Sequence, residues 1–218
     1  MYNLIMKDLR LGINSFFYVL PVLTGALMLI PGWIYFIVPL YFCWLTLPNM
    51  FAGFKAQNDL LFTAMMPVTK KDMVRARIVV IVFMELLHLI FAMIFGAITL
   101  RLYPHVTYYF FAPQMGFWGL CFVMFAIFNL IFIPMYYKTA YAYGKATTAS
   151  IAAAMLFAGV AQWMGIQNSS VADVFIGAGI DNTALQISIL AAGIVIFLAF
   201  TLIAYRVAIL RFRKVEAQ

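Results

Sequence analysis

Charged residues are scarce in this chain of 218 residues. Asp, Glu, Lys and Arg make up 10% of the sequence, whereas 67% of it is hydrophobic. Soluble domains typically contain about 25% charged residues, so the composition excludes an ordinary water-soluble fold. The length allows one membrane domain and leaves no room for a separate soluble catalytic domain. We therefore expect an all-α polytopic membrane protein with a single transmembrane domain over residues 1–218.

Catalytic and metal-binding motifs are also missing. Gly144-Lys145 is the nearest approach to a phosphate-binding loop, but Thr139 stands where the first glycine is needed and Ala146 where a Ser or Thr is needed. The two cysteines, at positions 43 and 121, both fall within hydrophobic runs and are interpreted as packing residues. We expect no enzymatic activity, no catalytic residue, and no metal or cofactor in this chain.

Long uncharged runs predict six membrane crossings. The run from Leu11 to Phe54 is long enough to cross twice, because one crossing needs about 20 residues, and Pro31-Gly32 is the natural point of reversal. The predicted crossings are Asn14–Ile30, Trp33–Phe54, Ile78–Leu100, Pro113–Tyr137, Thr147–Gln167 and Ala184–Arg206.

The basic residues give the orientation of these crossings. Every Lys and Arg except Arg101 falls on one side of the six-helix arrangement. The positive-inside rule then places both termini in the cytoplasm of a bacterial cell. Because the basic residues are dispersed among membrane boundaries, we expect them to face a lipid bilayer and not nucleic acid.

Three segments lie outside the predicted crossings. Residues 1–13 are expected to form an amphipathic helix that lies on the cytoplasmic membrane surface. Residues 168–183 form an external segment, where Ser170 and Asp173 resemble a capping pair and two glycines at 177 and 179 then break the helix. The third segment, residues 55–77, is a cytosolic loop between the second and third crossings.

The cytosolic loop carries two helix-start signals. Asn58 or Asp59 is suited to cap a short helix, which Pro67 ends, and Thr69 with Asp72 forms a second capping pair. A helix of about two turns is unstable alone in water, so the apolar residues of the first helix need lipid or another protein to pack against. These residues are Leu60, Leu61, Phe62, Met65 and Met66.

Glu85 and His88 are the ionisable pair that lies well inside a predicted crossing. They are three residues apart, so they share one helical face. Intramembrane ionisable groups are costly and often functional, which makes this pair a candidate for a substrate path or a proton relay. The structural alternative is a hydrogen-bonded pair that holds neighbouring helices together.

The order of these features resembles the permeases of type-2 ATP-binding cassette (ABC) transporters, in particular the short bacterial six-helix kind. The resemblance is carried by "NDLLFTAMMPVTKKDMVRAR", which runs from the cytosolic loop into the third crossing. Permeases of this family have a leucine-rich segment there, then a proline motif, an acidic residue and a basic helix. Many also place a glutamate-glycine pair before the leucines, whereas this chain has Gln57-Asn58-Asp59.

The resemblance implies that the loop is a coupling helix region that docks onto an ATPase. The implied docking residues are Leu60, Leu61, Phe62, Met65, Met66, Pro67, Val68, Thr69, Lys70 and Lys71. It further implies a dimer of permeases, of the same or homologous chains, with two ABC ATPase subunits that bind ATP and magnesium. The implied function is ATP-driven export of a peptide, an antibiotic or another amphipathic compound.

Two other functions remain open from the sequence. One is a non-transporting sensor or immunity subunit, which would keep the docking loop but show no substrate-dependent ATPase activity. The other is an ion- or proton-coupled carrier that uses Glu85 and His88 and depends on a proton gradient without ATP.

Overall fold

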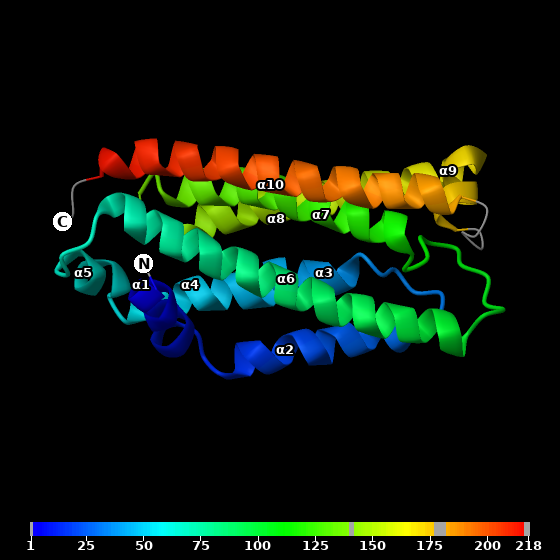
Figure 1. The fold of residues 1–218 in the computed structure, drawn as a ribbon, viewed down its shortest axis with the longest axis horizontal. Coiled ribbons are helices and arrows are strands. Elements are labelled where there is room, and N and C mark those ends of the chain that lie inside the picture. Colours follow the sequence, from blue (N-terminus) through cyan, green and yellow to red (C-terminus); the bar gives the residue numbers. More distant parts are fainter. Residues whose placement is uncertain (1, 140–141, 177–181, 216–218) are drawn as a thin grey trace.

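The computed structural model describes residues 2–139, 142–176 and 182–215, in which the regular structure is helical throughout. The long helices run roughly along one axis and form an elongated bundle (Figure 1). The helices are α1 (Tyr2–Lys7), η1 (Asp8–Gly12), α2 (Phe16–Gly25), η2 (Ala26–Leu29), α3 (Ile37–Tyr41), η3 (Phe42–Thr46), α4 (Leu47–Ala56), α5 (Asp59–Ala64), α6 (Lys70–Leu102), α7 (Met115–Tyr136), α8 (Tyr143–Gln167), α9 (Ser169–Phe175) and α10 (Thr183–Arg213). The expected all-α class is confirmed.

Within the part of the chain that the structure describes, five helices are long and apolar enough to cross a membrane. They are Ile37–Ala56, which runs continuously through α3, η3 and α4, then α6, α7, α8 and α10. They correspond to the second to sixth predicted crossings. The predicted first crossing becomes a shorter apolar helix over Phe16–Leu29. At 1.5 Å per residue this helix is about 21 Å long, which is less than the roughly 30 Å hydrocarbon core of a bilayer.

The short first helix is fastened to the long α6. Both of its parts, α2 and η2, pack against α6. The Thr99 hydroxyl of α6 also donates a hydrogen bond of 2.7 Å to the carbonyl of Met28. The chain then reverses between Leu29 and Ile37, where Gly32 has a left-handed backbone with φ of 71°. The predicted reversal at Pro31-Gly32 is therefore confirmed, and glycine supplies the positive φ that it needs.

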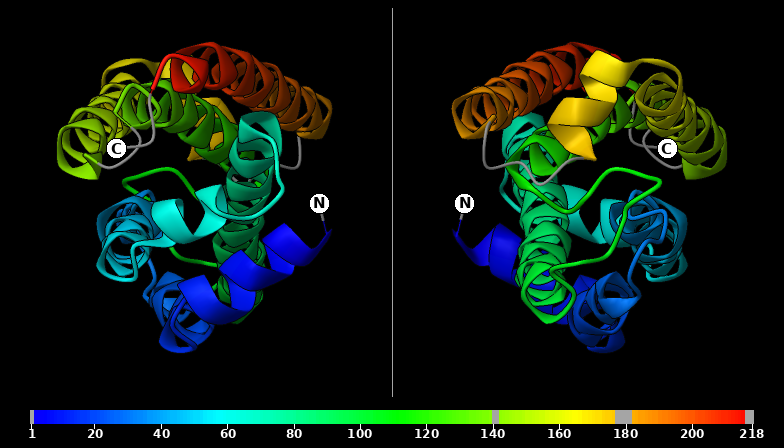
Figure 2. Two further views of the ribbon diagram at one scale, coloured as in Figure 1. Left: turned by 90° about the vertical axis from the view of Figure 1, so that its left-hand side faces the viewer. Right: turned by 90° about the vertical axis from the view of Figure 1, so that its right-hand side faces the viewer.

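The helices form two groups joined by α6. Figure 2 shows α7, α8 and α10 on one side of the molecule, and α2 and α4 on the other. Within the first group α7 and α10 are in very close contact, since a Cβ atom on Gly193 would lie 2.2 Å from the Gly119 carbonyl oxygen. Small residues permit this backbone approach, which is a common mode of helix packing in membranes.

A stripe of small residues on α8 is also used for packing inside the chain. Ala146, Ser150, Ala154 and Ala158 recur every four residues, and all four are buried. The helix packs mainly against α7, with further contacts to α4. The stripe thus brings together helices of one chain.

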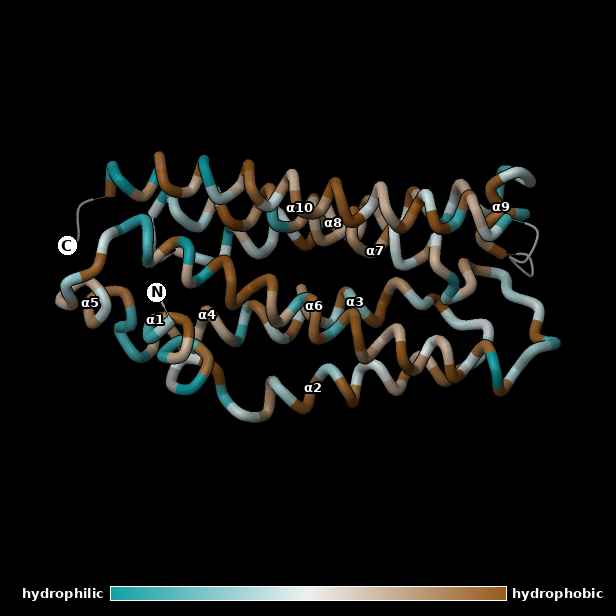
Figure 3. The backbone as a smooth tube through the Cα atoms, in the orientation of Figure 1, coloured by the Kyte–Doolittle hydropathy of each residue, from teal (hydrophilic) through white to brown (hydrophobic). Residues whose placement is uncertain are grey.

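The two ends of the bundle differ in polarity. Helices α1 and α5, the start of α6 and the end of α10 lie together at one end, while α9 lies at the other (Figure 1). Hydrophobic residues dominate the middle of the bundle, and hydrophilic residues are concentrated toward the two ends (Figure 3). We refer to the end that contains α1, α5 and the start of α6 as the α5 end.

The capping of the segment at the opposite end differs from the prediction. Helix α9 begins at Ser169, and its cap is Asn168, whose side chain accepts a hydrogen bond from the backbone N–H of Ser170. The prediction of a Ser170–Asp173 capping pair is therefore wrong, because Asn168 occupies the capping position. Glycines 177 and 179 lie outside the described residues.

Candidate functional site

The loop between α4 and α6 contains both of the helix starts that the sequence predicts. The first helix, α5, ends at Ala64, three residues before Pro67, so it is shorter than expected. Asn58 stands at its N-cap position with a left-handed backbone, and its side chain makes no capping hydrogen bond. The second start is as predicted: the Thr69 hydroxyl accepts a hydrogen bond from the Asp72 N–H at the beginning of α6.

Helix α5 exposes much of its apolar surface. The side chains of Phe62 and Met65 are 57% and 84% exposed, and Leu61 is 42% exposed. The remaining predicted docking residues lie around them: Pro67, Thr69 and Lys71 are exposed, and Leu60, Met66, Val68 and Lys70 are half-buried. Exposed apolar side chains on a short helix form the kind of surface that binds a partner.

One predicted docking residue is engaged within the chain. The Lys70 ammonium donates a hydrogen bond of 2.6 Å to the carbonyl of Val215, beyond the end of α10. It also lies 5.6 Å from the centre of the Phe212 ring. Lys70 therefore fastens the start of α6 to the end of α10.

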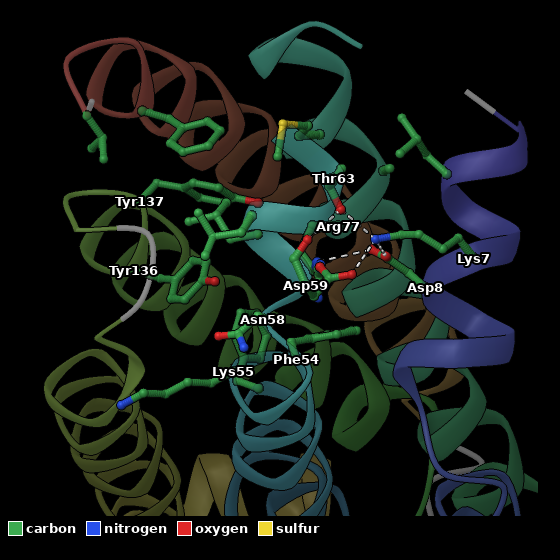
Figure 4. Close-up of a pocket in the computed structure, with 18 of the residues that line it drawn as sticks. Lys7, Asp8, Phe54, Lys55, Asn58, Asp59, Thr63, Arg77, Tyr136 and Tyr137 are labelled. Carbon is green, nitrogen blue, oxygen red and sulfur yellow. Dashed lines mark hydrogen bonds and ion pairs between the residues drawn. The ribbon is translucent and has the colours of Figure 1, made fainter. Parts of the chain in front are cut away.

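The opposite face of α5 is held by ion pairs. Asp59 binds both Lys7 of α1 and Arg77 of α6. Asp8 joins the same cluster, with its carboxylate oxygens 3.0 Å from the Lys7 ammonium and 3.0 Å from the Arg77 Nε. Lys7 also donates a hydrogen bond of 2.7 Å to the Thr63 hydroxyl of α5. These contacts join α1 and η1 to α5 and α6, as Figure 4 shows.

This cluster lies in the protein interior. Asp8 is 3% exposed and Arg77 is 9% exposed. Burial raises the pKa of the Asp8 carboxyl above its ordinary value, although Arg77 and Lys7 oppose this effect. A buried ion pair contributes little net stability but is costly to break, because the remaining partner becomes an uncompensated buried charge. The cluster therefore couples the positions of α1, α5 and α6.

A cavity of about 390 Å³ opens beside the ion-pair cluster. It lies at the α5 end, between the group of α7 and α10 and the group of α4, α5 and α6. We call it the Arg77 cavity (Figure 4). Its lining residues are Leu4, Lys7, Asp8, Phe51, Phe54, Lys55, Asn58, Asp59, Leu60, Leu61, Thr63, Met73, Ala76, Arg77, Tyr136, Tyr137, Thr139, Phe212 and Val215.

Glu85 and His88 share one face of α6 as predicted, but they bind different helices. The Asn129 amide of α7 donates a hydrogen bond of 3.0 Å to Glu85 and contacts the Thr201 hydroxyl of α10 at 3.4 Å. His88 lies 3.0 Å from the Thr46 hydroxyl of η3. Both side chains are almost fully buried, and neither lines the Arg77 cavity. Their contacts hold α6 to its neighbours.

Comparison with known protein families identifies the chain. The sequence model of the ABC-2 family transporter proteins matches residues 3–212, which is nearly the whole sequence. This chain belongs to the ABC-2 transporter family. Searches of curated proteins and of solved structures gave no match. The ABC-2 chain is accordingly a multi-pass membrane permease of the ABC transporter type, and the family resemblance noted from the sequence is confirmed.

The ion-pair cluster of this ABC-2 permease is not predicted by its sequence. Asp59 stands at a position suited to a helix cap, and no local pattern pairs it with Lys7 or Arg77. The available signal was the placement of two acidic residues, at 8 and 59, in segments that also carry basic residues. Partners 52 residues apart in the chain, such as Lys7 and Asp59, are decided by how the helices pack.

Proposed function

We propose that this ABC-2 chain is the permease subunit of a bacterial ATP-driven exporter. In this proposal a separate ABC ATPase binds ATP and magnesium, and the permease moves a peptide, an antibiotic or another amphipathic compound out of the cell. The chain works with a second permease and with two ATPase subunits. It crosses the cell membrane six times, with the α5 end and both termini in the cytoplasm.

Helix α5 is the observation that carries this proposal. It has an apolar outer face, with Phe62 and Met65 largely exposed, and an inner face fixed to two other helices through Asp59. Such a helix is suited to receive a partner on one side and to transmit its movement on the other. We infer that ATP-driven closure of the ATPase pushes α5 and, through Asp59, displaces α1 and α6.

The predicted location of α5 in the cytoplasm follows from charge. Lys and Arg residues are concentrated at the α5 end of the bundle, where α4, α5, α6 and α10 begin or finish. Positively charged flanks remain on the cytoplasmic side during membrane insertion. An ATPase that uses cytoplasmic ATP therefore has access to α5 and not to α9.

A docking experiment tests this proposal. The permease is co-expressed with a candidate ABC ATPase from the same organism, and the complex is captured through a tag on the permease. We expect the ATPase to copurify and F62D/M65D to reduce its recovery by about tenfold or more, because two charges replace apolar contacts in the interface. Tyr109, which is 81% exposed on a loop at the other end, supplies the matched control Y109D.

The outcomes separate the proposal from its alternatives. If the ATPase still copurified with F62D/M65D, α5 would not be the docking helix. If it did not copurify with the unsubstituted permease, the proposed ATP-driven function would be contradicted. A sensor or immunity subunit would bind the ATPase through α5 but give no ATPase stimulation by any transported compound. Y109D should behave as the unsubstituted permease in each measurement.

A further inference from the structure

The Arg77 cavity has the size and the lining of a small-molecule site. Its volume of about 390 Å³ lies within the range of roughly 300–1,000 Å³ that is common for ligand pockets. Part of its lining is apolar, with Phe51 and Phe54 from α4, Met73 from α6 and Phe212 from α10. The lining also contains the buried charges of the ion-pair cluster. An occupant must therefore be apolar along one part and polar at one end.

Arg77 has a hydrogen-bonding group that nothing in the described chain satisfies. Its Nε and Nη2 atoms bind Asp8 and Asp59, and its guanidinium carbon lies 3.3 Å from the centre of the Phe54 ring. The Nη1 atom is buried and has no hydrogen-bond partner among the described residues. A buried N–H donor without an acceptor is destabilising, and more so when it carries a charge. An acceptor from a ligand would remove this cost.

The charges around the cavity favour an anionic acceptor. Among the described residues, three cations line it, Lys7, Lys55 and Arg77, together with two acids, Asp8 and Asp59. Lys55 is exposed and extends on the side away from the ion-pair cluster (Figure 4). Arginine N–H groups also match phosphate oxygens well in geometry.

We propose that the Arg77 cavity binds the phosphate group of an anionic amphiphile. A phosphate oxygen accepts a hydrogen bond from Arg77 Nη1, and the hydrocarbon part lies against the apolar part of the lining, which includes Phe51, Met73 and Phe212. Lys55 adds positive potential at the exposed side. The same phosphate chemistry occurs in membrane lipid headgroups and in soluble phosphates, and the experiment distinguishes them. The site uses residues of this chain alone and does not depend on an ATPase.

Equilibrium binding of radiolabelled dodecyl phosphate tests this site. The full-length permease is purified in a neutral maltoside detergent, which competes for apolar surface without supplying phosphate. We expect saturable binding at one site per chain. R77Q should weaken binding by about tenfold or more through the loss of a charge-assisted hydrogen bond. M73W should also block binding, because it fills the cavity and leaves the four members of the ion-pair cluster unchanged.

If R77Q fails to fold, M73W alone tests the proposal. The folding of M73W is checked by thermal unfolding before its binding is measured. K145Q removes a cation from α8 that does not line the cavity, and it should bind as the unsubstituted chain does.

Competition with unlabelled inorganic phosphate identifies the source of the phosphate group. Displacement by inorganic phosphate at concentrations similar to those of dodecyl phosphate would indicate a site for soluble phosphates. Displacement only by the alkyl phosphate would indicate a lipid-like amphiphile. Absence of saturable binding, or binding that M73W leaves intact, would overturn the proposal.

Discussion

At the residue scale, the buried polar side chains of α6 are distributed between two roles. Arg77 belongs to the ion-pair cluster at the α5 end. Glu85 and His88 hold α6 to α7 and η3. Polar contacts of this kind satisfy groups that would otherwise be unpaired in an apolar interior. That these residues lie on one helix is predictable from the sequence, whereas their partners depend on how the helices pack.

Glu85 provides a test that separates packing from proton transport. One Glu85 oxygen accepts from Asn129, and the other has no partner in the described chain. Glutamine has nearly the same shape and keeps a side-chain oxygen that can accept the hydrogen bond from Asn129. We expect E85Q to unfold at nearly the same temperature as the parent and to support the same ATPase rate in the complex.

Alanine at the same position gives the contrasting result. E85A removes the acceptor of the Asn129 amide and leaves a gap in the interior, which should lower stability by about 1–3 kcal/mol. The measurement is thermal unfolding in detergent. If E85Q folded normally but abolished ATPase activity of the complex, Glu85 would take part in transport, as the carrier hypothesis requires.

At the element scale, glycines decide how closely α7 and α10 approach. A Cβ atom on Gly193 would overlap the backbone of Gly119, and a Cβ atom on Gly119 would overlap the backbone of Ile189 in α10. Backbone atoms cannot move aside as a flexible side chain can, so the two helices would have to separate. The sequence shows glycines at these positions but contains nothing that pairs them.

Alanine substitution at Gly193 tests this contact. We expect G193A to destabilise the permease by about 1–3 kcal/mol, which is the usual cost of overpacking a filled interior. The matched control is G159A on α8, because a Cβ atom on Gly159 would meet nothing within 4 Å. In that open position alanine should be neutral or slightly stabilising, since it favours the helix by up to about 1 kcal/mol relative to glycine. Equal unfolding temperatures for the two variants would contradict the close-packing account.

At the scale of the whole molecule, the chain has a helical bundle and one end that differs from the rest in its surface and its buried charges. The α5 end holds the exposed apolar helix, the ion-pair cluster and the Arg77 cavity. Hydrophobic residues also remain exposed along α8 and α10, where side chains such as Leu156 and Val195 are 70% and 65% exposed. These surfaces are suited to lipid or to a second permease.

The composition of the complex is the prediction at this scale. In the proposed exporter each of two permease chains docks one ATPase through its α5 helix, so we expect two permease chains and two ATPase subunits. Native mass spectrometry of the copurified complex measures this composition. A stable complex with one permease and one ATPase would contradict the proposed arrangement.

The sequence by itself determined the membrane class, the helical runs after the first, the reversal at Pro31-Gly32 and the Thr69 helix start. These features depend on local hydrophobicity and capping, which are readable along the chain. Tertiary structure alone decided that Asp59 binds Lys7 and Arg77, that Glu85 and His88 serve different helices, and that a cavity opens beside Arg77. Contacts between residues distant in sequence depend on the relative rotation and spacing of whole helices, which local sequence patterns do not encode.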